Sequence, residues 1–375
     1  MTKLGIIFSN LHDKNVPELT RDRTMASVPF GCRYRLVDFP LSNMANANIR
    51  HVGVITHYNY FSLMKHLSNG KEWNLASNKK GLIILPPFVS GYSSDNKTLY
   101  STRLEALKSI ASFILCATEE YTVMSDSDVV CNIDLNDVLK FHKEEGSDIT
   151  LVTNKTFIPR GFKVNHTFVT SNKGRICEIK KTDDDTHGYV NVIANITVVK
   201  TELLKSIIRQ ALSTGERSFT EDVIKKNLTK MKIFEYVFDG TYFCIDSLNA
   251  FYNANMELLS CCVRDGLFKS DDRRIYTSVH SSPPTRYSIS SNVKNSLIAD
   301  GCKIEGRVRD SIIFRGVTIG KGCNIENSII FENTQISPGV NIKHIICEKN
   351  VVITEGVNLT GHIKKPFFID KNSFI

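Results

Sequence analysis

Repetition with a fixed period dominates the C-terminal part of the chain and constrains the fold more than any other feature. Aliphatic residues recur every 17 positions in two registers, and the two positions within one repeat are six residues apart. The residues are Ile319, Ile336 and Ile353 in the first register and Ile325, Ile342 and Leu359 in the second. A third register repeats the tetrapeptide NSLI at 295–298 as DSII at 310–313 and NSII at 327–330. Hexapeptide periodicity of this kind is typical of a parallel β-helix, in which each aliphatic side chain stacks on its counterpart one coil away.

The first 155 residues follow a different pattern, in which short apolar runs alternate with helical stretches. The expected strands are 4–8, 51–56, 81–85, 121–124 and 148–153, and the expected helices are 41–48, 58–66, 104–115 and 135–144. Such alternation predicts a mostly parallel, doubly wound sheet with helices on both faces.

The length of 375 residues is sufficient for about two domains with sizeable cores. We place an α/β domain at 1–260, a linker at 261–290 and the β-helix domain at 291–375. The linker is polar and contains the clusters DDRR at 271–274 and PP at 283–284.

Composition excludes several classes of protein. The net charge is +8, but no block of Lys and Arg is long enough for a nucleic-acid-binding arm. No apolar stretch approaches a membrane span, and the first apolar run is too short for a signal peptide. The ten cysteines include no C-x-x-C pair, which argues against zinc and iron–sulfur sites and favours reduced thiols in the cytoplasm.

A segment after the first predicted strand carries the most specific motif, SVPFGCRYRLVDFPLSN at 27–43. Loops after strands of open α/β sheets lie at the carboxyl edge, where ligands bind. The motif resembles the corresponding segment of ADP-glucose pyrophosphorylases, the glucose-1-phosphate adenylyltransferases of glycogen synthesis. The similarity continues in HVGVITHYNYFSLMKHLSNGKEWNL at 51–75, LIILPPF at 82–88 and FYNANMELL at 251–259. It spans nearly the whole chain and implies a Rossmann-like nucleotidyltransferase domain with a doubly wound mixed sheet, followed by a left-handed parallel β-helix that makes subunit contacts.

The chain departs from this family where the family binds phosphates. The loop at 8–20 contains no glycine, although a loop that cradles a triphosphate needs glycine to turn its N–H groups inward. An ungapped alignment from VPFG places the family's loop arginine at Asn15, its lysine at Met25 and its proline at Ala26. In these losses the chain resembles the regulatory, GlgD-like subunits of two-subunit pyrophosphorylases.

Two candidate residues belong to the nucleotide side of the site. Tyr100 matches a family tyrosine that lies beside the nucleotide, although a tyrosine at a helix entry is equally consistent with a surface position. The following Thr102 and Arg103 replace a Gly-Thr pair, so the arginine would fill part of the space for the base. Asp128 matches the family aspartate that binds Mg²⁺, which prefers hard oxygen ligands. Asp126 is a close competitor, and a capping or loop aspartate is the structural alternative.

The resemblance also assigns residues on the sugar side. Lys181 matches the lysine that pairs with the sugar phosphate, whereas its glutamate partner has become Lys180. Phe219 keeps a family position within SFTEDVI at 218–224. The second magnesium aspartate of the family falls on Cys244, and a thiol is a poor ligand for magnesium. Asp246 could compensate only if the register shifts.

Three hypotheses follow. The first is a non-catalytic or weakly active regulatory subunit of glucose-1-phosphate adenylyltransferase, which assembles with a homologous catalytic subunit into a hetero-oligomer, expected to be a tetramer. Its Mg²⁺ binding would be weak or absent, and its ligands would be small anionic sugar phosphates or nucleotides, with no nucleic acid and no membrane. The second is an active adenylyltransferase with a divergent nucleotide loop. The third, a hexapeptide acyltransferase, has little support because His344 and His362 are isolated in the repeats.

Overall fold

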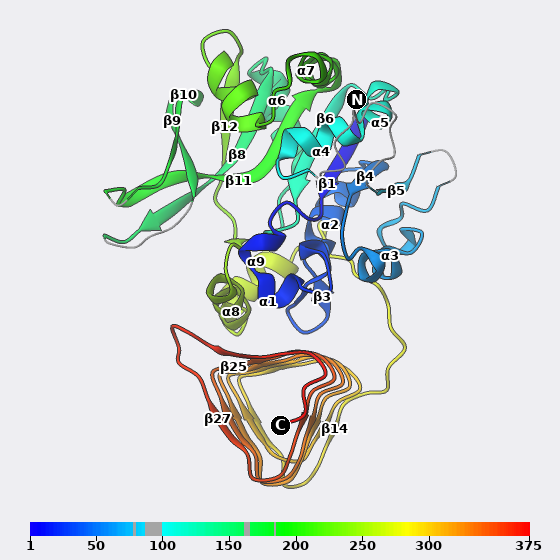
Figure 1. The fold of residues 1–375 in the computed structure, drawn as a ribbon, viewed down its shortest axis with the longest axis vertical. Coiled ribbons are helices and arrows are strands. Elements are labelled where there is room, and N and C mark those ends of the chain that lie inside the picture. The colour runs from blue at the N-terminus through cyan, green and yellow to red at the C-terminus, as the bar shows by residue number, and fades with distance from the viewer. Residues whose placement is uncertain (78–79, 87–99, 161–165, 184) are drawn as a thin grey trace.

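The structure is a computed structural model that describes residues 1–77, 80–86, 100–160, 166–183 and 185–375 (Figure 1). Pro87 and Phe88, which end the LIILPPF segment, lie outside these ranges. Figure 1 shows an α/β domain above a triangular β-helix that is viewed along its axis.

The N-terminal domain is built on a nine-stranded mixed sheet with the order β5-β4-β1-β6-β11-β8-β12-β10-β9. Strand β1 lies between β4 and β6 and is parallel to both. Strand β11 runs antiparallel to β6 and β8. The strands are β1 Lys3–Phe8, β4 His51–Ile55, β5 Leu82–Leu85, β6 Tyr121–Asp126, β8 Ile149–Ile158, β9 Thr167–Asn172, β10 Arg175–Lys181, β11 Gly188–Lys200 and β12 Ile233–Phe238. Two small antiparallel pairs are β2 Pro29–Phe30 with β3 Tyr34–Arg35, and β7 Val129–Cys131 with β13 Tyr242–Cys244.

Helices cover both faces of this sheet, as the alternating pattern predicted. Neighbouring residues of β1 point to opposite faces, so Ile6 packs in the cluster with α4, α5 and α7, and Ile7 packs in the cluster with α2 and α6. The helices in the described ranges are α1 Pro17–Thr20, α2 Asp38–Asn46, α3 Phe61–Leu67, α4 Arg103–Ser109, α5 Ala111–Leu115, α6 Leu135–Glu144, α7 Thr201–Thr214, α8 Leu248–Glu257 and α9 Cys261–Phe268.

The expected elements are confirmed, with two informative differences. Helix α6 has the predicted bounds, because Asp134 caps its first turn and its buried residues recur at helical spacing. The single helix expected at 104–115 is instead two helices, α4 and α5, which meet at Ile110 with a non-helical ψ of 24°. Strand β8 runs beyond the predicted residue 153 to Ile158 and, with β9, β10 and β11, extends as an arm from the sheet (Figure 1).

The C-terminal domain is a left-handed parallel β-helix made of three parallel sheets with five strands each. Residues of the predicted registers stack coil on coil: Ile319 pairs with Ile336 and then with Ile353. The first sheet contains β14 Arg286–Tyr287, β17 Lys303–Ile304, β20 Thr318–Ile319, β23 Gln335–Ile336 and β26 Val352–Ile353. The second contains β15 Asn292–Lys294, β18 Arg307–Arg309, β21 Asn324–Glu326, β24 Asn341–Lys343 and β27 Asn358–Thr360. The third contains β16 Leu297–Ile298, β19 Ile312–Ile313, β22 Ile329–Ile330, β25 Ile345–Cys347 and β28 Phe367–Ile369.

Both ends of the segment predicted as a linker, 261–290, form regular structure. Its first part forms helix α9, which packs against the N-terminal domain through the fully buried Leu267, and its last part contributes β14 to the first coil. The segment between them is held along the domain surface, since the Asn132 side chain donates to the carbonyl oxygens of Leu267 and Arg273, each at 2.8 Å.

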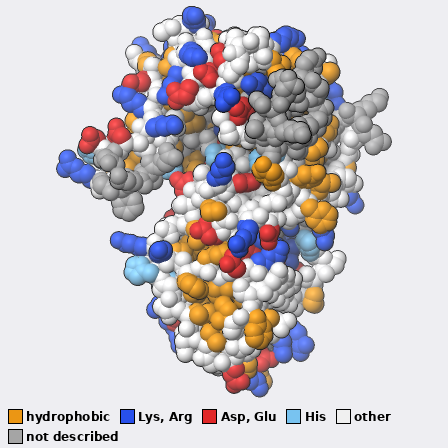
Figure 2. All heavy atoms as spheres, in the orientation of Figure 1, with side chains coloured by type: hydrophobic (Ala, Val, Ile, Leu, Met, Phe, Trp, Pro, Cys, Tyr) orange, Lys and Arg blue, Asp and Glu red, His pale blue; other side chains and the backbone are white. Residues whose placement is uncertain are grey.

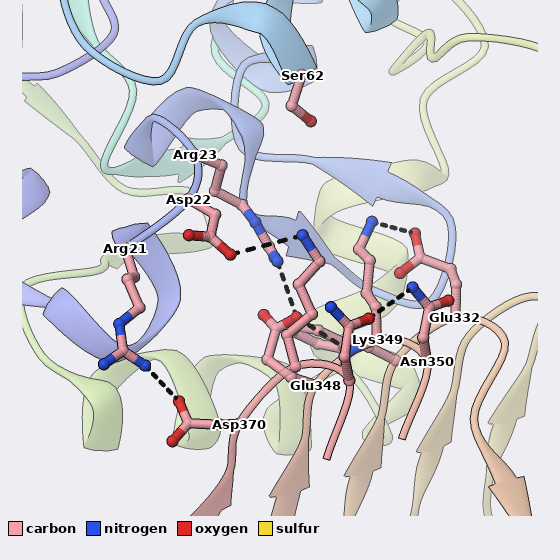
Figure 3. Close-up of polar contacts among 12 residues, drawn as sticks. Arg21, Asp22, Arg23, Ser62, Glu332, Glu348, Lys349, Asn350 and Asp370 are labelled. Carbon is pink, nitrogen blue, oxygen red and sulfur yellow. Dashed lines mark hydrogen bonds and ion pairs between the residues drawn. The ribbon is translucent and has the colours of Figure 1, made fainter. Parts of the chain in front are cut away.

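The two domains share one buried cluster and a network of ion pairs. Phe251 of α8 lies edge-on to Phe331 of the β-helix, with ring centroids 6.1 Å apart. Beside this contact, Arg23 of the α/β domain reaches Glu348 of the β-helix, and within the β-helix Lys349 reaches Glu332 at 3.0 Å (Figure 3). The position of the β-helix on the α/β domain is therefore set by apolar packing and by buried charge together.

Candidate functional site

A cavity of about 270 Å³ lies at the carboxyl edge of the central sheet. Its lining comes from the loop after β1, the start of α4, the end of β6, the middle of β11, the π-helical turn Phe219–Ile224 and the segment after β13. This is the edge at which open α/β sheets bind ligands.

Two carboxylates form the floor of this cavity. Asp126 ends β6 and Asp128 follows it in the turn to β7, and each residue is only 1% exposed. His12, from the loop after β1, places Nε2 2.7 Å from Asp126 Oδ2 and 3.5 Å from Asp128 Oδ2. The three ligand atoms lie within 4.8 Å of one another.

Arg103 provides a second cation at the same carboxylates. It is the first residue of α4, and its Nη2 donates to Asp126 Oδ2 at 2.8 Å and to Asn195 Oδ1 at 3.3 Å. Asn195 in turn donates from Nδ2 to Asp128 Oδ2 at 3.2 Å. The guanidinium also lies 5.6 Å from the centroid of the Phe8 ring. Arg103 therefore bonds Asp126 directly and is connected to Asp128 through one amide.

These contacts shift the pKa values of His12, Asp126 and Asp128. Burial lowers the pKa of His12, but Asp128 and Asp126 outweigh burial and raise it to about 9. Burial raises the pKa of Asp126, yet Arg103 and His12 hold it below its usual value. The pKa of Asp128 is raised, mainly by burial.

Cys244 lies where the alignment places the second magnesium aspartate. Its Sγ is 3.7 Å from Asp128 Oδ2, and β13 holds it opposite Val129. Burial and the neighbouring Asp128 raise the pKa of this thiol well above its usual value, so the group stays neutral at pH 7. Asp246 lines the same cavity, with Oδ2 3.9 Å from His166 Nδ1.

These donors do not suit magnesium. Mg²⁺ prefers oxygen ligands in a near-octahedral arrangement. Here the Asp126 carboxylate already accepts from His12 and Arg103, and the side chain beside Asp128 is a neutral thiol.

Met25 and Asn15 are the two positions at which the resemblance predicts that phosphate-binding cations have been lost. Met25, in the 3-10 turn Met25–Ser27, is 1% exposed and belongs to the buried cluster that both domains share. Its N–H donates to Asp13 Oδ1 at 2.8 Å. Asn15 lines the cavity with a neutral amide. The loop after β1 is therefore packed as part of the core on one side and offers no cation at these two positions.

The structure brings together only some of the residues assigned from sequence. Asp128 and Phe219 line the cavity, with Phe219 only 2% exposed. Tyr100 packs on the His57 ring at 4.6 Å, and its buried hydroxyl has no hydrogen-bond partner among the described residues. Lys181 is exposed at the end of β10, paired with Thr167, and is not among the described residues that line the cavity. The substrate roles of these residues stay predictions.

Sequence reasoning missed His12 and Asn195. His12 is 114 positions from Asp126, and an isolated histidine in a loop carries no motif. Asn195 lies in an irregular stretch of β11 with a φ of 55°, where the pairing with β8 shifts register. A left-handed residue inside a strand is visible only once the backbone is known.

Comparison with known proteins agrees with this architecture. Residues 14–260 match the nucleotidyl transferase family model, and residues 284–365 match the GlmU-like C-terminal hexapeptide model. The chain is 33% identical to the glycogen biosynthesis protein GlgD of Bacillus subtilis, over 86% of this chain and 82% of the relative. It is 33% identical to GlgD of Geobacillus stearothermophilus, over 85% and 81%. It is 29% identical to the glucose-1-phosphate adenylyltransferase of Mycoplasma mobile, over 86% and 84%.

Within the described ranges, no helix has the length and apolar character needed to cross a bilayer. The matches extend through both domains. The chain thus belongs to the ADP-glucose pyrophosphorylase (glucose-1-phosphate adenylyltransferase) family of nucleotidyl transferases and is GlgD-like within it.

Proposed function

We propose that the chain is a non-catalytic or weakly active regulatory subunit of glucose-1-phosphate adenylyltransferase in glycogen biosynthesis. The observation that carries this proposal is Cys244, whose neutral thiol contacts Asp128 where the family has its second metal-binding carboxylate. Adenylyl transfer depends on positioning and on neutralising phosphate charge. A site with one such carboxylate replaced by a thiol cannot hold a bridging divalent ion in the same way.

The loss of cations reinforces the proposal. Met25 and Asn15 stand where the family has a phosphate lysine and a phosphate arginine, and Met25 is sealed in the core. Loss of one group that stabilises a transition state commonly costs about a hundredfold to a thousandfold in rate. Three losses in one site leave a negligible rate even if their effects overlap.

Assembly with a homologous catalytic subunit, expected as a hetero-tetramer, is the second part of the proposal. In the last coil, residues 373–375 pair with β26, whereas the outer edges of β27 and β28 have no following strand among the described residues. Figure 2 shows hydrophobic side chains gathered on the end of this domain that carries the C-terminus. Exposed large hydrophobic residues in the last coil are Ile363, Phe367 and Phe374. Unpaired strand edges with exposed apolar residues favour pairing with another chain.

The test is to assay ADP-glucose formation by the purified chain, by a catalytic glucose-1-phosphate adenylyltransferase from the same organism, and by the two co-expressed. We expect negligible turnover for the chain alone and altered kinetics for the mixture relative to the catalytic subunit. A turnover number for the chain alone that matches the catalytic subunit would refute the proposal.

An active enzyme with a divergent loop is the second candidate. The observation in its favour is Asp246, a carboxylate that lines the same cavity as Asp128 and lies two residues after Cys244. If activity were found, Asp246→Asn would abolish it under this hypothesis. Asp370→Asn, an exposed carboxylate on the β-helix, is the control that should leave it unchanged.

A further inference from the structure

We infer that Arg103 is a built-in cation that takes the place of a divalent metal ion at Asp126 and Asp128. The inference deepens the proposed function and rests on it for the view that these carboxylates descend from a metal site. It makes a separate claim, because it concerns which cation the carboxylates hold and not whether the chain turns over substrate.

The contacts support this role directly. Arg103 Nη2 lies 2.8 Å from Asp126 Oδ2, an ordinary length for a charge-assisted hydrogen bond. The same nitrogen reaches Asn195 Oδ1 at 3.3 Å, and Asn195 donates to Asp128 Oδ2 at 3.2 Å. The guanidinium thus bonds Asp126 directly and is connected to Asp128 through Asn195, beside His12, which contacts both carboxylates. A link to both carboxylates is the structural task of a bridging ion.

The local backbone fixes this arginine in place. Thr102 caps α4, because its Oγ1 accepts from the N–H of Glu105 at 3.3 Å. Glu105 Oε2 in turn accepts from the N–H of Ser101 at 2.9 Å, so the helix start is held from both sides. The Arg103 side chain is only 14% exposed. Its guanidinium is therefore preorganised and loses little freedom when it bonds Asp126.

His12, Asp126 and Asp128 by themselves have a spacing that could hold a metal ion. Arg103 opposes metal binding here, because a divalent ion held by Asp126 would lie next to the guanidinium that is already bonded to that carboxylate. Like charges at such a distance in a buried site repel strongly. The arginine must leave before an ion can enter.

One oxygen of each carboxylate is still available. Asp126 Oδ1 and Asp128 Oδ1 are buried and have no hydrogen-bond partner among the described residues. They are the donors that an ion would use once the arginine is absent. Removal of Arg103 is therefore expected to create metal binding. This is a demanding test, because a substitution that merely damages the site would not create a new affinity.

The test uses Mn²⁺ as a paramagnetic substitute for Mg²⁺ and the full-length chain, without substrate. Free Mn²⁺ is measured by electron paramagnetic resonance during titration of the wild-type chain, Arg103→Thr and Arg103→Lys. We expect no saturable binding at millimolar Mn²⁺ for the wild type or for Arg103→Lys, which keeps the cation. Arg103→Thr, which restores the residue type of the family, should bind at least about tenfold more tightly.

Arg217→Thr is the matched control, because this arginine lies 3.7 Å from Glu105 near the cavity but is 77% exposed. It removes the same charge without touching Asp126, and we expect no gain of binding. Thermal melting gives a second readout: Mn²⁺ should raise the Tm of Arg103→Thr and not that of the wild type. Should Arg103→Thr fail to fold, Arg103→Thr/Asp126→Asn, which also removes the stranded charge, should fold and bind no Mn²⁺.

Saturable Mn²⁺ binding by the wild-type chain, or equal binding by wild type and Arg103→Thr, would overturn the inference. Neither result depends on turnover, so the inference can fail while the regulatory role stands. The reverse also holds, since an active chain without metal affinity would refute only the proposed function.

Discussion

The Arg23 guanidinium and the Glu348 carboxylate lie 2.8 Å apart and join the α/β domain to the β-helix across 325 positions of sequence. Their side chains are 7% and 3% exposed (Figure 3). A buried pair of this kind contributes little over an apolar pair of equal size, but removal of one partner strands the other charge. This contact therefore helps to fix the relative position of the two domains, and replacement of only one of its two residues should be destabilising.

The first prediction concerns this pair. Arg23→Leu should lower the free energy of unfolding by about 3–5 kcal/mol, because Glu348 is left buried without its cation. Arg23→Leu/Glu348→Leu should recover much of the loss. Chemical denaturation followed by circular dichroism measures both. Arg21→Leu is the control: its partner Asp370 is 65% exposed, and the change should cost no more than about 1 kcal/mol. Equal losses for Arg21→Leu and Arg23→Leu would contradict the assignment.

The second prediction concerns assembly. Phe374 is 76% exposed on the last coil, and Phe374→Asp should weaken association with the catalytic subunit without loss of folding. Ile289, on the first coil and fully exposed, is the matched position at the opposite end of the β-helix. Light scattering of co-expressed subunits gives the mass of the complex. Dissociation by Ile289→Asp alone would place the interface at the first coil.

The third prediction concerns the ligand of the cavity. Glucose-1-phosphate should bind weakly and ATP more weakly still, because Asn15 and Met25, which the family resemblance assigns to the triphosphate, are neutral. Asn15→Arg returns a cation to the cavity lining and should tighten ATP binding by about tenfold, as expected for one charge-assisted hydrogen bond. Asn15→Gln lengthens the side chain without charge and serves as the control. Isothermal titration measures both, and equal affinities for the two variants would disprove the role of charge.

The fourth prediction concerns pH. Burial, together with Lys200, lowers the pKa of His142 to about 4, and its Nδ1 pairs with Thr150 Oγ1 at 2.8 Å. The unfolded chain takes up this proton near the ordinary histidine pKa of about 6.5, before the folded chain does. The contribution of His142 is therefore complete above pH 6.5 and is lost as pH falls toward 4. His142→Asn, which keeps a polar partner for Thr150 but does not titrate, should show a shallower loss of Tm over that window. Identical pH profiles would exclude His142 as a contributor.

Sequence alone was sufficient where structure is local or periodic. The stacking of Ile319, Ile336 and Ile353 follows from a repeat that each coil imposes on the next, so the β-helix could be predicted in register. Helix α6 was predicted to the residue, because its cap and its apolar spacing lie within ten neighbouring positions. The family resemblance, together with Asp128 and Cys244, depended on motifs of a few residues each.

Only the tertiary structure decided what the altered site contains. Arg103 was expected to fill space, but its bond to Asp126 joins residues that are 23 positions apart. His12 reaches the same carboxylate across 114 positions, and no motif links them. Such contacts arise because parallel strands bring their carboxyl ends to one edge of the sheet, whatever their separation in the chain. A sequence specifies which charges are present, and the packing of β1, β6 and α4 decides which of them neutralise one another.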